Sequence, residues 1–285
     1  SPFVTENTEY TVAGTRFAYP PDDKGSNPDV AISSYKENFK GSLSFIKVDK
    51  ESGKMGIDFQ IITPPFDYDL SHAGKGPSDG WFFFSCYNSE QAHTLLEVNA
   101  SQKDKDFVLA VNYRKIAELV ASGGKGTMGK TRFAHNVFDE KTQTAATEWV
   151  EQVKTVNAAD LKGMMYYMPC PKSPHGADVD PTGEYITAGG KLAAVIPVYS
   201  FSKMIKAIEG NQTDGEIDGI PVLKYDAVLA GEVQNPGLGP LHTEFDDKGF
   251  AYTSAFVSSE VVKWKVATRE VVDRIPTYYS IGHLT

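Results

Sequence analysis

The chain has 285 residues, of which 41% are hydrophobic and 23% charged, a composition ordinary for a globular protein with a buried core. Its 28 Lys and Arg residues face 37 Asp and Glu residues, and the resulting net charge of −9 argues against nucleic-acid binding as a main role. No apolar run approaches the length of about 18 residues that a membrane span needs. The sequence starts at Ser1 without a secretory leader, so we expect an internal piece of a longer protein.

The residue types favour β-structure. The 16 Phe and 14 Tyr residues, together with 25 Gly and 16 Pro, are typical of many short strands joined by tight turns. The two cysteines, Cys86 and Cys170, form no Cys-x-x-Cys motif, which excludes a disulfide framework or a structural zinc site. We interpret both as small buried hydrophobic residues.

In chain order, turn-and-strand patterns first occur at Glu6–Ala13 and Asp79–Tyr87. Three short helices are predicted from apolar residues spaced three to four apart, and we interpret them as insertions in an otherwise all-β chain. They are Arg114–Ala121, Ala146–Val153 and Ser202–Ile208.

Residues 124–131, Gly-Lys-Gly-Thr-Met-Gly-Lys-Thr, match the phosphate-loop pattern G-x-x-x-x-G-K-[ST]. That loop requires a buried strand before it and a helix that starts at the Lys-Thr pair. Here a helix is predicted before the motif and extended chain after it. We therefore reject nucleotide binding and expect a surface loop, although loss of ATP affinity in Lys130→Ala would revive it.

The second half of the chain contains an internal repeat. Residues 175–185 and 242–252 each read as a His, a short strand, an Asp-x-x-Gly turn and a second strand. Further strands follow at Ile196–Phe201 and Glu260–Val266. Together with the two earlier patterns, these repeats favour the blades of a β-propeller.

The repeat places His175 and His242 at equivalent positions in two blades. Such positions are related by rotation about the propeller axis, so both imidazoles would meet at the hub, where they could bind copper, zinc, iron or nickel. The alternative is a set of hub histidines bonded to backbone carbonyls. His72, His93 and His135 are interpreted as structural residues.

Three motifs resemble nitrous-oxide reductase. They are Lys172–Tyr185, Gly237–Asp246 and Tyr279–Leu284, in the family's order, and the similarity extends back through Tyr87–Glu90 to cover nearly the whole chain. The Ser71–Trp81 loop and the Tyr278-Tyr279 pair resemble the divergent, non-proteobacterial-type branch most closely.

The resemblance implies that residues 1–285 are part of an N-terminal seven-bladed β-propeller with short helical insertions. In this periplasmic family the hub holds a four-copper sulfide cluster on seven histidines, and nitrous oxide is reduced there to dinitrogen and water. The motifs carry over His175, His242 and His283 as three of those ligands. The other ligands and a cupredoxin domain with binuclear copper would lie outside the chain, so the chain alone is expected to be inactive.

The family also implies calcium, a head-to-tail homodimer and an electron donor such as cytochrome c or a cupredoxin. Its calcium site carries over to Tyr87 and Glu90, with Asp104 and Asp106 as rival candidates for a third ligand, while Ser173 replaces an Asn found in some relatives. Carboxylate oxygens suit this hard cation. The alternative function is a propeller used for binding or scaffolding, with hub histidines that hold no metal.

Overall fold

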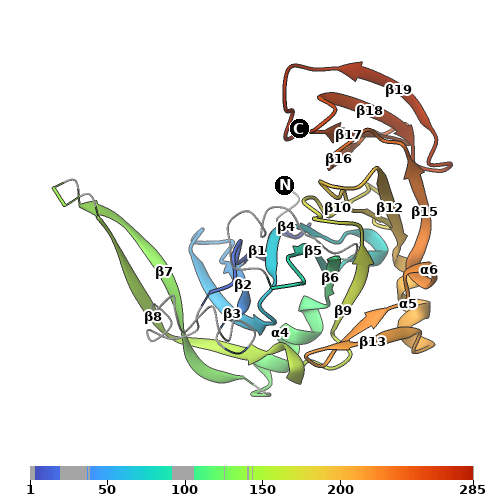
Figure 1. Ribbon diagram of the computed structural model, residues 1–285. Helices are drawn as coiled ribbons and strands as arrows, with labels where there is room; N and C mark the ends of the chain where they lie inside the picture. Colours follow the sequence, from blue (N-terminus) through green and yellow to red (C-terminus); the bar gives the residue numbers. More distant parts are fainter. Residues whose placement is uncertain are drawn as a thin grey trace.

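The computed structural model describes residues 4–19, 37, 39–91, 106–124, 126–139, 141–142 and 144–284, with backbone only for 130–139 and 144–151. These residues form four β-sheets that follow one another along an arc (Figure 1). Short strands, tight turns and few helices confirm the all-β class and the blade-like sheets. No helix in the described part of the chain is long and apolar enough to cross a membrane.

The two predicted repeats form the third and fourth sheets, which are four-stranded and antiparallel, and the fourth is a meander of consecutive strands. Their Asp-x-x-Gly turns form as expected, because Asp180 and Asp246 accept backbone N–H groups of the following turn and Gly183 and Gly249 adopt positive φ. The strands are β10 (Asp178–Val179), β11 (Tyr185–Thr187), β12 (Val195–Ser200) and β15 (Leu229–Gln234), then β16 (Pro240–Phe245), β17 (Phe250–Ala255), β18 (Glu260–Lys265) and β19 (Val271–Pro276).

The second sheet begins with another meander and is extended by a hairpin. Its central strands are buried on both faces, which explains their continuous apolar sequences such as Phe-Phe-Phe-Ser-Cys-Tyr. The strands, in spatial order, are β13 (Thr213–Ile217), β14 (Ile220–Leu223), β9 (Met165–Cys170), β6 (Asp106–Val111), β5 (Phe82–Tyr87) and β4 (Asp67–Ala73).

The first sheet contains β1 (Tyr10–Gly14), β2 (Gly41–Val48) and β3 (Met55–Thr63), followed by β8 (Thr144–Asn157) and β7 (Thr127–Asp139). The hairpin of β7 and β8 projects away from the other sheets (Figure 1). The predicted helix at Ala146–Val153 is wrong, because this segment lies within β8. Its Thr- and Val-rich sequence favours a strand, and it pairs along its length with β7.

The phosphate-loop match lacks the required helix in the structure, as predicted, but the surface loop expected at residues 124–131 is wrong from Thr127 on, because the chain forms a β-strand there. A helix, α4 (Tyr113–Ala121), precedes it, and β7 starts at Thr127 and runs through the Lys130-Thr131 pair, so no helix N-terminus is available for an anion. The expected helix at Arg114–Ala121 is thereby confirmed. The third predicted helix is also confirmed as α5 (Phe201–Glu209), while the single turn α6 (Tyr225–Val228) and two 3-10 turns were not predicted.

The core lies within and between the sheets. One cluster of aromatic side chains joins the first two sheets, with Phe45 stacked on Phe59 at 4.6 Å between ring centroids. A second cluster packs α5 against the second and third sheets through Phe201 and Met204. Cys86 and Cys170 are free and fully buried, as expected. The innermost strands β4, β10 and β16 are thereby fixed side by side, and they carry the candidate site.

Candidate metal centre

Three histidines that are distant in sequence converge at one point. His175 lies just before β10, His242 lies on β16, and His283 lies in the segment after β19. Their ring centroids are 4.5–5.5 Å apart, and one potential ligand atom from each lies within 4.8 Å of the others. The structure therefore brings together all three predicted copper ligands, including the pair that the repeat placed at equivalent positions.

Small residues allow this close approach of neighbouring sheets. A Cβ on Gly176 would lie 2.6 Å from the carbonyl oxygen of Leu241, and one on Gly189 would lie 2.5 Å from that of Pro240. The backbone N–H of His175 donates to Gly189, and Ser254 Oγ donates to the carbonyl of Gly282 beside His283. Glycine is thus required where the His175 loop passes β16.

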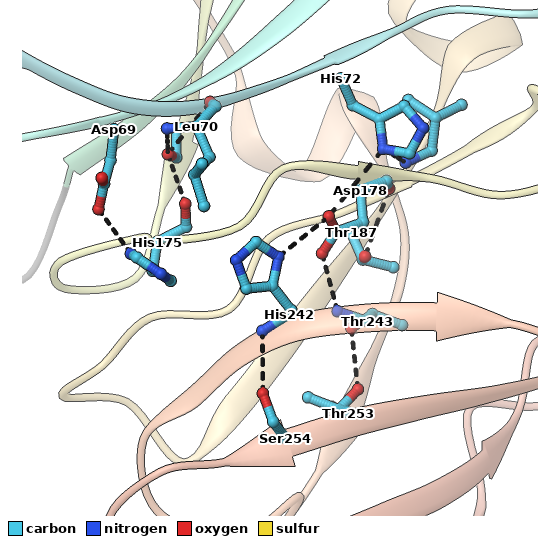
Figure 2. Close-up of polar contacts among 12 residues, drawn as sticks. Asp69, Leu70, His72, His175, Asp178, Thr187, His242, Thr243, Thr253 and Ser254 are labelled. Carbon is cyan, nitrogen blue, oxygen red and sulfur yellow. Dashed lines mark hydrogen bonds and ion pairs between the residues drawn. The ribbon is translucent and has the colours of Figure 1, made fainter. Parts of the chain in front are cut away.

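Each of the two repeat histidines is held by a carboxylate from the preceding sheet (Figure 2). His175 Nδ1 lies 2.5 Å from Oδ2 of Asp69 on β4, and His242 Nδ1 lies 3.4 Å from Oδ1 of Asp178 on β10. An ionised carboxylate accepts, so in both rings Nδ1 carries the proton and Nε2 keeps its lone pair. His242 Nε2 is buried and has no hydrogen-bond partner among the described residues, as expected for a group awaiting a metal ion.

The carboxylate of Asp178 on β10 contacts two residues of β16. Its Oδ2 accepts the backbone N–H of Thr243 at 2.8 Å, in addition to the contact of Oδ1 with His242. His72 lies on the other side, 4.0 Å from Asp178, but its Nδ1 accepts the backbone N–H of Val179. His72 is therefore a structural residue, as the sequence indicated, and does not join the three-histidine cluster.

The charges around the cluster shift several pKa values. Burial alone would raise the pKa of Asp178, but the hydrogen bond from His242 and the nearby His72 ring outweigh it and hold the pKa at about 2. Burial would lower the pKa of His242, and the bond to Asp178 raises it instead. Burial and the two neighbouring imidazoles lower the pKa of His283. The cluster thus combines two carboxylates that stay ionised with imidazoles that compete for protons, which favours a cation at its centre.

Asp69 has further partners that no sequence motif revealed. Arg16 Nη1 lies 3.2 Å and Lys191 Nζ 3.8 Å from the same Oδ2 atom that contacts His175. Burial would raise the pKa of Asp69, but the bond from His175 and the nearby cations lower it. Arg16 and Lys191 also lie over the ring of Tyr87, at 5.2 and 5.0 Å from its centroid.

Asp106, one of the residues considered for calcium, is held by backbone groups of two segments. The Asp106 carboxylate is fully buried and accepts the backbone N–H groups of Ser89 (3.1 Å) and Ser173 (2.8 Å). Tyr87 Oη and Ser173 Oγ are buried without a hydrogen-bond partner among the described residues, while Glu90 is half-buried. Asp104 lies outside the described residues, as does His93, and the side chain of His135 is not described.

A pocket of about 560 Å³ lies beyond the cluster, along the same inner strands. His72 and Lys75 line one side of it and Glu244 lines another. The segment that carries Lys75 packs closely against the Gly183 turn, where a Cβ would lie only 1.8 Å from the Lys75 carbonyl oxygen.

The chain is distantly similar to curated nitrous-oxide reductases. It is 27% identical to that of Stutzerimonas stutzeri over 288 residues, which is 98% of this chain and 39% of the relative. It is 27% identical to that of Pseudomonas fluorescens over 91% of the chain, and 28% identical to that of Ralstonia nicotianae over 70%. The chain spans 28–39% of the length of these relatives. No protein-family model matches the chain.

Among solved structures, the backbone is similar to a periplasmic gluconolactonase of Pseudomonas aeruginosa, with a TM-score of 0.49 at 13% identity over 96% of this chain and 56% of that one. Kuenenia stuttgartiensis hydrazine synthase gives a TM-score of 0.49 at 14% identity over 93% of this chain and 57% of that one. Likeness at this level carries no information about function.

Proposed function

We propose that this chain supplies three histidine ligands, His175, His242 and His283, to a copper centre that reduces nitrous oxide to dinitrogen and water. The observation that carries the proposal is the convergence of these three imidazoles, two of them with Nδ1 held by a carboxylate and Nε2 left for a metal. The distant relatives, all named nitrous-oxide reductase, supply the reaction.

The donor set fits copper. Imidazole nitrogens suit copper, zinc, iron or nickel, and the buried, unpartnered Nε2 of His242 is a donor without another role among the described residues. Three neutral ligands add no charge, so a cluster bound there keeps the charge set by its own ions and bridging atoms. When bound, copper would supply the electrons that convert nitrous oxide to dinitrogen.

The protein residues act by positioning. Asp69 and Asp178 fix the tautomer and the ring orientation of His175 and His242, and the sheets that carry them are held by the cores described above. Because the resemblance implies seven histidine ligands and the chain provides three, the chain alone should bind copper without assembling a complete cluster. A periplasmic location, an external electron donor and a head-to-tail homodimer are part of this proposal.

Calcium is proposed at Asp106, with Glu90 and Tyr87 as further oxygen ligands. The unpartnered oxygens of Tyr87 and Ser173 support this position, because both residues lie beside the segments that donate to Asp106. Such an ion would tie the end of β5, the start of β6 and the segment before His175 together.

The proposal is tested by anaerobic titration of the 285-residue chain with Cu(I) against a competing chelator. Tight binding that depends on His175, His242 and His283 is expected, together with no turnover of nitrous oxide. Sustained turnover by this chain would contradict the incomplete ligand set. Absence of copper binding would instead favour the alternative of a scaffold with metal-free hub histidines.

Nitrous-oxide reduction itself needs a second test. The full-length gene proposed to contain this segment should restore nitrous-oxide consumption in a denitrifying host that lacks its own reductase, and His242→Ala in that gene should abolish it. If copper binds but nitrous-oxide consumption is not restored, the assignment of the metal site holds and the proposed reaction is wrong.

A further inference from the structure

We infer that Arg16 and Lys191 are positioning residues that tune the candidate copper site through Asp69, making the metal on His175 easier to reduce than it would otherwise be. This inference rests on the proposed copper-binding function. It starts from a difference between two carboxylates that otherwise occupy equivalent places.

Asp69 is surrounded by cations. One of its oxygens, Oδ2, faces His175 Nδ1 at 2.5 Å, Arg16 Nη1 at 3.2 Å and Lys191 Nζ at 3.8 Å. The side chain of Asp69 is only 7% exposed and that of Lys191 only 21%, so these charges are weakly screened. Arg16 and Lys191 therefore share the single negative charge that also accepts the hydrogen bond from His175.

Asp178 lacks such partners. In the described part of the chain its side chain faces His242 and His72 and makes no ion pair with Lys or Arg. Its carboxylate charge therefore acts on His242 without a Lys or Arg charge beside it. The two repeat histidines have the same carboxylate–imidazole arrangement but differ in the net charge behind it.

The placement of the two cations is specific. Arg16 and Lys191 lie over the ring of Tyr87, whose side chain is fully buried. Cation–π contact with a buried ring fixes both charges beside Asp69. The backbone N–H of Lys191 also donates to the carbonyl oxygen of Ser173, two residues before His175. The cation and the histidine are thus held by the same short segment.

The charge difference has a predictable effect on a bound metal. A carboxylate that accepts from a ligating imidazole makes it a stronger donor and favours the higher oxidation state. Arg16 and Lys191 weaken this effect at His175, and their positive charge also disfavours Cu(II) relative to Cu(I) by direct repulsion. His175 is thereby a weaker donor than it would be without Arg16 and Lys191.

The test compares the affinities of the purified chain for Cu(I) and Cu(II), together with the reduction potential of the bound copper. Lys191→Met keeps the aliphatic stem over Tyr87 and removes the charge. It should lower the ratio of Cu(I) to Cu(II) affinity about three- to tenfold, equivalent to about 30–60 mV for a one-electron couple. Lys191→Arg should restore the wild-type ratio.

Controls separate tuning from loss of structure. Lys263 also lies over aromatic rings, at 4.1 Å from the Phe250 centroid, but on β18, two strands from His242, so Lys263→Met should leave the ratio unchanged. Arg16→Met, at a side chain that is 41% exposed, repeats the test if Lys191→Met fails to fold.

The outcomes are distinguishable from those of the proposed function. If wild-type chain binds no copper, the proposed function and this inference both fail. If it binds copper with the three histidines and neither cation variant changes the affinity ratio or the potential, only the tuning role is overturned. An equal fall in affinity for Cu(I) and Cu(II) would likewise overturn the tuning role. It would show that Arg16 and Lys191 only maintain the structure of the site.

Discussion

Asp178, the first residue of β10, lies 3.4 Å from Nδ1 of His242 on β16, so a carboxylate of one repeat supports the histidine of the next. Asp69 on β4 does the same for His175. Each of these two histidines is therefore supported by a carboxylate from a neighbouring sheet. The two supporting carboxylates can be mutated separately from the metal ligands.

Removal of a ligand should weaken copper binding strongly. His242→Ala is expected to lower Cu(I) affinity by more than about 100-fold, since the loss of a ligand has a larger effect than the 10- to 100-fold loss typical when a residue that supports a ligand is removed. Competition with a Cu(I) chelator measures it. His135→Ala, on the projecting strand β7, is the matched control and should have no effect. Equal losses in both variants would refute the assignment of His242.

Removing the charge of a supporting carboxylate should weaken copper binding less than removing a ligand does. Asp178→Asn keeps an oxygen that can accept from Thr243 but removes the charge next to His242, so copper affinity should fall about 10- to 100-fold. Competition with a Cu(I) chelator again measures the affinity. Asp246→Asn, in the exposed turn of the next repeat, removes a carboxylate that does not contact the cluster and serves as the control. Unchanged affinity in Asp178→Asn would show that the contact has no role in metal binding.

Calcium should stabilise the chain. Addition of Ca²⁺ to chelator-treated protein is expected to raise the midpoint of thermal unfolding by about 2–4 °C for each kcal/mol of binding energy. Glu90→Gln should reduce the rise, and Glu51→Gln, in the exposed turn after β2, should not. A calcium response that is identical in both variants would exclude Glu90 as a ligand.

Stability should depend on pH through Asp67. Burial raises the pKa of this carboxyl to about 7, against hydrogen bonds from the Ala18 N–H and Asn88 that lower it. A raised carboxyl pKa means that the folded state is favoured while Asp67 is protonated and loses stability as the pH rises from about 4 through 7. The loss is roughly 4 kcal/mol if the unfolded pKa is ordinary.

Asp67→Asn tests this dependence. The amide keeps an acceptor for Ala18, so the variant should gain stability relative to the wild type between pH 4 and 8, as measured by urea unfolding at several pH values. Asp49→Asn, at an exposed turn whose carboxyl pKa is lowered, should show no such gain. A difference between wild type and Asp67→Asn that stays constant with pH would contradict the raised pKa.

The two equivalent turn glycines should differ in their tolerance of alanine. Gly183 and Gly249 have φ of 74° and 81°, but a Cβ would lie 1.8 Å from the Lys75 carbonyl oxygen at Gly183 and have no neighbour within 4 Å at Gly249. Gly249→Ala should cost about 1–2 kcal/mol from backbone strain alone, and Gly183→Ala about 4 kcal/mol or more. Urea unfolding of both variants measures the difference, and equal costs would show that the turn shifts to relieve the clash.

The sequence predicted the features that depend on local spacing. The turns at Asp180 and Asp246, the strands around them and the helices at α4 and α5 follow from residue types a few positions apart, and they were confirmed. The repeat also predicted that His175 and His242 meet, because rotation relates equivalent positions.

Features that depend on partners distant in sequence could not be predicted. The helix expected at Ala146–Val153 is a strand because β7 pairs with it, and no local pattern reveals that partner. Asp69 and Asp178 were missed as supports of the histidines, since each contacts a residue 106 or 64 positions away. The relatives, at 27–28% identity, support a distant relationship and do not distinguish one branch of nitrous-oxide reductases from another.

The location of each supporting carboxylate in the sheet before its histidine sets the smallest unit that can be moved between proteins. A single repeat excised with His242 would leave Asp178 behind, whereas two adjacent sheets transfer a complete carboxylate–histidine pair. Gene duplication or recombination that preserves the site must therefore keep both sheets of such a pair together and never separate a carboxylate from its histidine.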